Sequence, residues 1–345
     1  MRYQHPIIAA TLFLSFTALL RAQESPASSN NAADFLRLEY VDGKPTSLQT
    51  AVTSYHASAP GGVQVDLIGA VHIGEASYYQ ELNKLFDTYE VLLYELVAPE
   101  GTVIPRGGKR EGTNPVAMLQ DSAKNMLGLE SQLELIDYTK THFVRADMTP
   151  QQISDKMSER GDTALTLALS TVADVMRQQN LAAQTGERNA LADLEDLSLV
   201  DIMSNPLKMK RVLAQQFADS GSLDKALGGP LNQLLIVDRN AEALRGLQKQ
   251  IAQGKKRIGI FYGAAHLPDL EKHLLEDFGL KKVVATSVRD KPAKSQTTVE
   301  LPTDSEQPAS ENPRWLVAWD LTTAKQPELS QPASLLLNLL KALDQ

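Results

Sequence analysis

The sequence predicts an α/β protein whose mixed, largely parallel sheet is made of two βαβ halves with a large central helical insertion. Two observations lead to this fold class. Apolar runs rich in β-branched residues at 63–73 and 90–97 are typical of strands buried on both faces, and a stretch with helical spacing lies between them. The same order of strand, helix and strand returns at 256–288, after a long region of helical pattern.

The composition narrows the classes of function. The chain has 345 residues, enough for one large domain or two small ones. Its 34 basic and 42 acidic residues give a net charge of −8, which disfavours a nucleic-acid-binding protein because such proteins usually carry a basic face. Cysteine is absent, so disulfides, thiolate ligands and a cysteine nucleophile are excluded. Any metal must be held by histidines and carboxylates.

The N-terminus indicates export. An apolar stretch at 6–20 follows Arg2 and has the length of a signal peptide, while a membrane-spanning helix needs about 20 apolar residues. We expect cleavage after Ala22, so that residues 1–22 are a signal peptide and 23–34 a flexible tether. The protein is then periplasmic or secreted. We expect it to contact a membrane only if this segment stays uncleaved and anchors the chain.

The body of the protein is expected to be one α/β domain over residues 35–290. It starts with a short hairpin at 36–56, and its helical insertion covers about 115–253. Within the insertion, Thr149 and Pro150 are good signals for the start of a helix, and Gly254 for the end of a long one. Residues 291–313 are rich in Pro, Ser, Thr and Glu and predict a disordered linker. Residues 314–345 predict a strand and a final helix.

Two histidines recur in the same frame of small residues. Gly69 precedes His72, and Gly263 precedes His266, each time at the end of a predicted strand. In parallel α/β sheets, ligands bind beyond the carboxyl ends of the strands. A single histidine of this kind is most often a core or capping residue, but two in matched frames predict a shared site at one edge of the sheet.

Glu95 is the third candidate. It lies near the end of an apolar strand, where an ionised carboxylate is costly unless it is paired or binds a metal. A salt bridge to a buried arginine would explain it, but two imidazoles and one carboxylate are also a common ligand set for a catalytic divalent ion. We therefore expect His72, His266 and Glu95 to bind Mn, Co or Zn. Whether Glu95 is a ligand or a general base stays open.

Other polar residues are weaker candidates. Arg239 lies in a helix and is expected either to stabilise a substrate oxyanion, to orient Glu95, or to form a structural ion pair. Asp147 caps a turn or completes the site. Glu75 begins a helix, where an acidic residue is favourable, and Tyr78 and Tyr79 are expected in the helical core.

At these residues the chain resembles the TraB/PrgY/GumN family, which includes the Tiki proteins. Family members carry two GxxH motifs, a glutamate at the end of the strand after the first motif, and an acidic-Arg-Asn element in a helix. The matching residues are Gly69 and His72, Gly263 and His266, Glu95, and Asp238, Arg239 and Asn240. The segment "HFVRADMTP" is also similar, and the likeness covers roughly 35–290. The resemblance implies a fold similar to the erythromycin-esterase/ChaN group and the activity of a metal-dependent protease or related hydrolase.

Two hypotheses of function follow. In the first, the protein is an exported metal-dependent hydrolase in which metal-activated water attacks a carbonyl of a peptide or protein, and Glu95 and Arg239 assist catalysis. In the second, the protein is a non-catalytic binding or regulatory protein that holds a peptide or haem with the same residues. The sequence lacks GxSxG and HExxH, which excludes an α/β-hydrolase nucleophile elbow and a zincin motif.

Overall fold

The computed structural model describes residues 34–59, 61–108, 127–163, 166–167, 205–219, 230–283 and 312–323. Several expectations from the sequence lie outside these residues. They are the signal peptide, the tether except its last residue, the linker except its last two residues, and the final helix. Among the described residues, no helix combines the length and the apolar character needed to cross a membrane.

The protein is α/β, and its main sheet has eight strands among the described residues, in the order β1-β2-β3-β8-β5-β7, with β9 and β10 also paired to β2. The strands are β1 Leu36–Val41, β2 Lys44–His56, β3 Gln64–Ala70, β5 Val91–Tyr94, β7 Phe143–Arg145, β8 Arg257–Gly263, β9 Lys281–Lys282 and β10 Arg314–Asp320. Strand β2 is antiparallel to all four of its neighbours, and the remaining pairs are parallel. Thus β2 alone runs against the other strands, and the sheet is mixed with mostly parallel strands, as the sequence predicts.

The two strand–helix–strand units interleave. The first runs through β3, α2 (Ala76–Phe86) and β5, and the second through β8, α12 (Leu267–Glu276) and β9. Strand β8 lies between β3 and β5 and is parallel to both. Strand β9 does not return beside β8 but pairs with β2. The strands that precede the two GxxH histidines are therefore direct neighbours.

The described part of the expected helical insertion contains helices and non-helical connecting segments, with two strands as exceptions to the expectation. Its helices are α4 Gln132–Leu135, α5 Pro150–Arg160, α9 Pro206–Asp219, the π-helical turn η3 Gln233–Val237 and α11 Asp238–Ala252. The exceptions are β7, which adds to the main sheet, and β6 (Glu130–Ser131), which pairs with β4 (Ile73–Gly74) in a second, two-stranded sheet. The span therefore contributes strands as well as helices.

The helix start expected at Thr149 is confirmed. The Thr149 side chain accepts a hydrogen bond from the N–H of Gln152, and the Gln152 side chain accepts one from the N–H of Thr149, which is a complete capping box. The long helix expected to end at Gly254 ends at Ala252, and the π turn η3 directly precedes its first residue, Asp238. Such π turns inside helices are frequent at functional sites.

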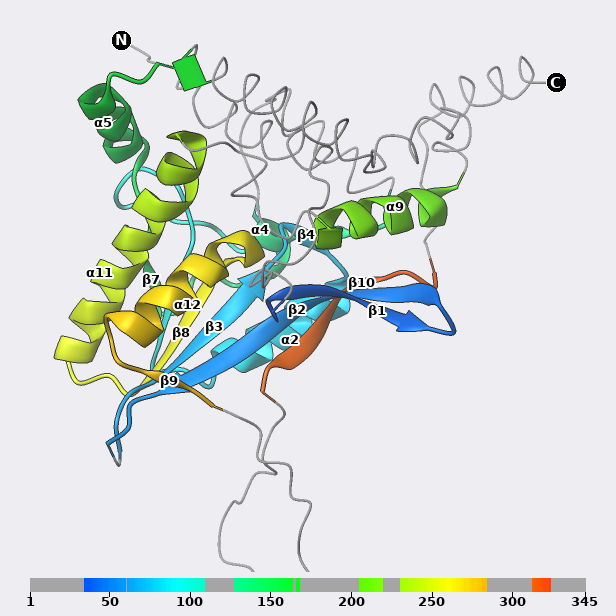
Figure 1. Ribbon diagram of the computed structural model, residues 1–345, viewed down its shortest axis with the longest axis horizontal. Coiled ribbons are helices and arrows are strands. Elements are labelled where there is room, and N and C mark those ends of the chain that lie inside the picture. The colour runs from blue at the N-terminus through cyan, green and yellow to red at the C-terminus, as the bar shows by residue number, and fades with distance from the viewer. Residues whose placement is uncertain are drawn as a thin grey trace, which may run out of the picture.

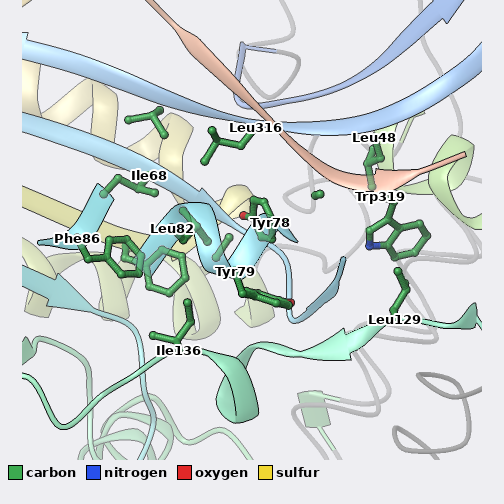
Figure 2. Close-up of a cluster of buried hydrophobic side chains, with 14 of the residues drawn as sticks. Leu48, Ile68, Tyr78, Tyr79, Leu82, Phe86, Leu129, Ile136, Leu316 and Trp319 are labelled. Atoms are coloured by element: carbon green, nitrogen blue, oxygen red, sulfur yellow. The ribbon is translucent and has the colours of Figure 1, made fainter. Parts of the chain in front are cut away.

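The sheet buries both of its faces. On one face, α2 packs through Tyr78, Leu82 and Phe86 against a cluster that includes Ile68 and Trp319, as Figure 2 shows. On the other face, α11 and α12 cover β3, β8 and β5 (Figure 1). Adjacent residues of β3 alternate between the two clusters, which explains why its sequence is apolar throughout. This packing makes the carboxyl ends of the central strands a rigid platform.

Candidate active site

The predicted site residues follow three neighbouring strands. His72 comes after β3, His266 after β8 and Glu95 after β5, with β8 in the middle. Both imidazoles act electrostatically on the Glu95 carboxyl group and lower its pKa, which places them near it. The topology therefore brings His72, His266 and Glu95 to one edge of the sheet.

The two GxxH segments are not structural copies of each other. Gly263 pairs with Ala70 rather than with Gly69, so the segments are offset by one residue in the parallel register. His266 is 4% exposed and ends the 3-10 turn η4 (Ala264–His266), which leads directly into α12. His72 lies in the short loop between β3 and β4, and it is exposed. The matched sequence frames thus yield one buried and one accessible histidine.

Glu95 uses both of its carboxylate oxygens. Oε1 accepts a hydrogen bond of 2.6 Å from Arg239 Nη2, and Oε2 accepts one of 2.7 Å from the backbone N–H of Gly263. Burial opposes ionisation of this carboxyl group. The charge of Arg239, the electrostatic effects of the two histidines and the hydrogen bond from the Gly263 N–H outweigh burial and lower the pKa of Glu95 well below the usual range. Glu95 is therefore a carboxylate at neutral pH.

The two glycines of the GxxH segments have different tasks. A Cβ atom at Gly263 would lie 3.2 Å from Glu95 Oε2, so this glycine gives the carboxylate access to the backbone N–H. A Cβ atom at Gly69 would instead lie 3.3 Å from Thr50 Cβ and 3.4 Å from Leu267 Cδ1, where β3 packs against its neighbours. Only Gly263 is required by the site itself.

Arg239 and Asp147 form a buried ion pair behind Glu95. Arg239 Nε and Nη2 donate to the two oxygens of Asp147 at 2.9 and 2.7 Å, and the Asp147 side chain has 0% exposure. Burial raises the pKa of Asp147, while the guanidinium opposes that rise. Since Nε and Nη2 are occupied by carboxylates, the contacts of Arg239 fit the role of orienting Glu95 better than that of binding a substrate oxyanion. Asp147, a weak candidate from sequence, is the residue that fixes Arg239.

Neighbouring residues of α11 take separate roles. Asp238 turns away from the site and accepts two hydrogen bonds from Arg160 Nη2, which ties α5 to α11. Asn240 is fully buried and points at His266. Its Nδ2 donates to His266 O at 3.0 Å and to Asp269 Oδ2 at 2.8 Å, and its Oδ1 lies 2.7 Å from His266 Nδ1.

The Asn240 contacts determine the tautomer of His266. Because Nδ2 donates to two oxygens, the atom facing the imidazole is the acceptor Oδ1, so Nδ1 carries the hydrogen. Burial lowers the pKa of His266 to about 3, and the ring is neutral at pH 7. Its Nε2 therefore presents a lone pair, 3.7 Å from the ionised Glu95 Oε1. Two acceptors face each other, an arrangement that a cation or a proton donor between them would stabilise.

The loop that carries His72 is held by its backbone. Four carbonyl groups between residues 69 and 73 accept hydrogen bonds from donors in other elements. Tyr78 Oη donates to Gly69 O at 2.8 Å, and Tyr79 Oη donates to Val71 O at 2.9 Å. Gln132 N donates to His72 O at 2.9 Å, and Trp319 Nε1 donates to Ile73 O at 2.7 Å. The two tyrosines are buried in the core, as expected, but no sequence pattern indicates this second role of their hydroxyl groups. His72 thus combines a backbone held by hydrogen bonds with an exposed side chain.

Glu75 begins α2 as the residue before its first turn, in agreement with the sequence prediction. Its carboxylate forms an ion pair with Lys210 of α9 and accepts a hydrogen bond from Asp320 N at 3.2 Å. It therefore has structural partners and is not placed as a further ligand.

The part of the chain that the structure describes holds no group of three or more His, Asp or Glu side chains already arranged to bind a metal ion. His266 Nε2 and Glu95 Oε1 lie 3.7 Å apart, and His72 follows the neighbouring strand β3. No family model, curated protein or solved structure matches this chain.

Proposed function

We propose that this protein is an exported metal-dependent hydrolase of the TraB/PrgY/GumN type, in which His266, Glu95 and His72 hold one divalent cation. The observation that carries the proposal is the distance of 3.7 Å between His266 Nε2 and Glu95 Oε1. The first atom presents a lone pair, and the second belongs to an ionised carboxylate. A water molecule could also bridge these atoms, but the two donors are of the types that Mn, Co and Zn bind together.

The surroundings of His266 support a ligand role. Metal-binding histidines nearly always donate their other ring N–H to a neighbouring acceptor, which fixes the ring and its tautomer. Asn240 Oδ1 is such an acceptor, at 2.7 Å from Nδ1. The neutral state of the imidazole suits the same role, because a protonated ring has no free lone pair.

The remaining donors complete a set with open positions. Glu95 is held by Arg239 and Gly263 and needs no rearrangement to offer Oε1. His72 would join by rotation of its exposed ring on the anchored loop. Three protein donors leave positions for water and substrate, as catalytic sites require.

The bound ion and the residues around it have separate roles in the proposed reaction. The bound ion would polarise a substrate carbonyl and make its bound water more acidic. Glu95 serves as a ligand rather than a general base, because a carboxylate with so low a pKa accepts protons poorly at neutral pH. Arg239 is a positioning residue that holds Glu95, and Asp147 holds Arg239. Peptides or proteins are the substrate class that the family resemblance implies.

A peptide-library digest tests the hydrolase against the rival binding protein. The full chain is incubated with a mixed peptide library after addition of Mn²⁺, Co²⁺ or Zn²⁺, alongside Glu95→Gln and the control His56→Ala, which changes an exposed histidine on β2. We expect metal-dependent cleavage in the wild type and the control, and none in Glu95→Gln. A protein that cleaves nothing but gives a Soret band with haem, lost in His72→Ala, would instead be a binding protein.

Export is a separate part of the proposal. It rests on the apolar stretch at 6–20. N-terminal sequencing of protein recovered from outside the cytoplasm should begin at Gln23. A protein that begins at Met1 and stays in the cytoplasm would overturn this part alone.

A further inference from the structure

Gln132 is a buried amide beside the site with an unused oxygen. It is 6% exposed and is the first residue of the short helix α4, close to the end of β3 (Figure 1). Its backbone N–H donates to His72 O at 2.9 Å. Its side-chain Nε2 donates to Tyr138 Oη at 2.8 Å, whereas its Oε1 is buried with no hydrogen-bond partner among the described residues. A buried acceptor without a partner is unfavourable and calls for an explanation.

Tyr138 has a hydroxyl hydrogen that donates to no group among the described residues. Since its oxygen accepts from Gln132 Nε2, that bond leaves the phenolic hydrogen free to donate elsewhere. Burial raises the pKa of Tyr138, and the charge of Glu95 raises it further, so the hydroxyl group keeps its hydrogen at any working pH. The effect of Glu95 also shows that the phenol lies near the end of β5.

The pair contacts two of the segments that carry the candidate site residues. Gln132 contacts the loop that carries His72. The Tyr138 ring packs on Tyr94, the residue before Glu95, with the ring centroids 5.0 Å apart. One acceptor and one donor without partners among the described residues, linked by a hydrogen bond, therefore lie beside the candidate site, next to the His72 backbone and the end of β5.

We propose that Gln132 and Tyr138 recognise an amide group of the substrate, with Gln132 Oε1 accepting from the substrate N–H and Tyr138 Oη donating to its carbonyl oxygen. The proposal rests on the proposed function, because it names the bond that the hydrolase binds. It includes a small rotation of the Gln132 amide, which turns the buried Oε1 toward the substrate. A group with one donor and one acceptor, such as a peptide bond, satisfies both residues, whereas an ester lacks the donor.

Binding of matched amides and esters tests this inference. The probes are N-methylamides of short carboxylic acids that contain no other amide, and the corresponding methyl esters, in which oxygen replaces the N–H. Binding to the full-length protein as purified is measured by ligand-observed NMR. We expect the wild type to bind the amides about tenfold more tightly, which corresponds to one well-made hydrogen bond. Gln132→Leu should reduce this preference to near unity, because it removes the acceptor for the N–H. Tyr138→Phe should weaken binding of amides and esters alike, because both probe sets have the carbonyl oxygen.

A matched control separates recognition from stability. Gln216 of α9 is 5% exposed and also has a buried Oε1 without a partner among the described residues, so Gln216→Leu makes the same chemical change elsewhere. It should keep the wild-type preference for amides, and thermal melting should show all variants folded. A wild-type ratio near one, no detectable binding of either probe set, or a preference that survives Gln132→Leu would overturn the inference. Failure of the proposed function would have a different result, namely that the wild-type protein binds no metal. Gln132→Leu should leave the metal content of the protein unchanged.

Discussion

Asn240 Oδ1 lies 2.7 Å from His266 Nδ1, and this contact decides which ring nitrogen faces Glu95. It depends on the two bonds that Asn240 Nδ2 makes to His266 O and Asp269 Oδ2, because these fix the orientation of the amide. One asparagine thus sets the tautomer, and with it the lone pair on which the proposed cation site depends.

Loss of the Asn240 contact that sets the His266 tautomer should weaken metal binding. In Asn240→Leu the acceptor for Nδ1–H is lost, so the ring no longer favours the tautomer with a free Nε2. Loss of such an outer contact typically costs 10- to 100-fold in metal affinity. Competition with a chromogenic chelator measures the effect. An unchanged metal affinity in a folded Asn240→Leu protein would show that the contact between Asn240 and His266 has no part in metal binding.

Acid should destabilise the metal-free protein through His266. Its pKa in the folded protein is about 3, below the value of 6.5 for the free side chain, so between these values the unfolded chain takes up a proton that the folded protein does not. Stability therefore falls as the pH drops from 6.5 toward 3, by about 2 kcal/mol over the first two units. Glu95, whose pKa is lowered, adds a further loss below pH 4.5.

Urea unfolding of chelator-treated protein at several pH values measures this dependence. His266→Gln should remove the loss between pH 6.5 and 4.5 and keep the loss below it. Parallel curves for wild type and variant over the upper range would contradict the burial of a neutral His266.

The glycines of the two GxxH segments should respond differently to alanine. At Gly263, φ is −48° and ψ is 136°, which any residue adopts, so the effect of alanine arises from its Cβ atom beside Glu95 Oε2. Gly263→Ala should displace the carboxylate and lower metal affinity by about tenfold or more. Gly69→Ala should reduce stability through packing but leave metal affinity unchanged once the protein is folded. Equal effects on metal affinity would show that Gly263 has no special role.

The buried ion pair behind Glu95 should matter more than the outer one. Asp147→Asn removes one of the two carboxylate charges that pair with the buried Arg239 guanidinium and should cost about 3 kcal/mol or more in the free energy of unfolding. The matched change in the same region, Asp238→Asn, removes the partner of the partly exposed Arg160 and should cost about 1 kcal/mol or less. Chemical denaturation measures both. A small loss in Asp147→Asn would mean that Asp147 does not hold Arg239 in solution.

The fold was largely predictable because β3, β5 and β8 are buried on both faces and therefore have continuous apolar sequences. Strand β7 was missed, since three half-buried residues give no periodic signal. The pairing of β9 with β2 was also missed, because register and partner choice depend on contacts distant in sequence. The π turn before Asp238 has no counterpart in the periodicity of the apolar residues.

Only those candidate site residues that belong to a recognisable sequence motif could be predicted from the sequence. Histidines in matched frames and a carboxylate in an apolar strand drew attention to His72, His266 and Glu95. The functions of Asn240 and Gly263 arise from contacts across 26 and 168 residues, which no local pattern reveals. The same holds for Gln132. Attention falls on this residue because its buried Oε1 has no hydrogen-bond partner among the described residues, and not because of its sequence context.

Metal analysis of the purified protein tests the central claim most directly. Wild type, His266→Ala, His72→Ala and the control His56→Ala are purified identically, exposed to Mn²⁺, Co²⁺ and Zn²⁺, desalted, and analysed for bound metal by mass spectrometry. The account predicts one equivalent of metal in the wild type and the control, with marked loss in His266→Ala and His72→Ala. Equal metal content in all four proteins, or none in the wild type, would contradict a cation shared by His72, His266 and Glu95.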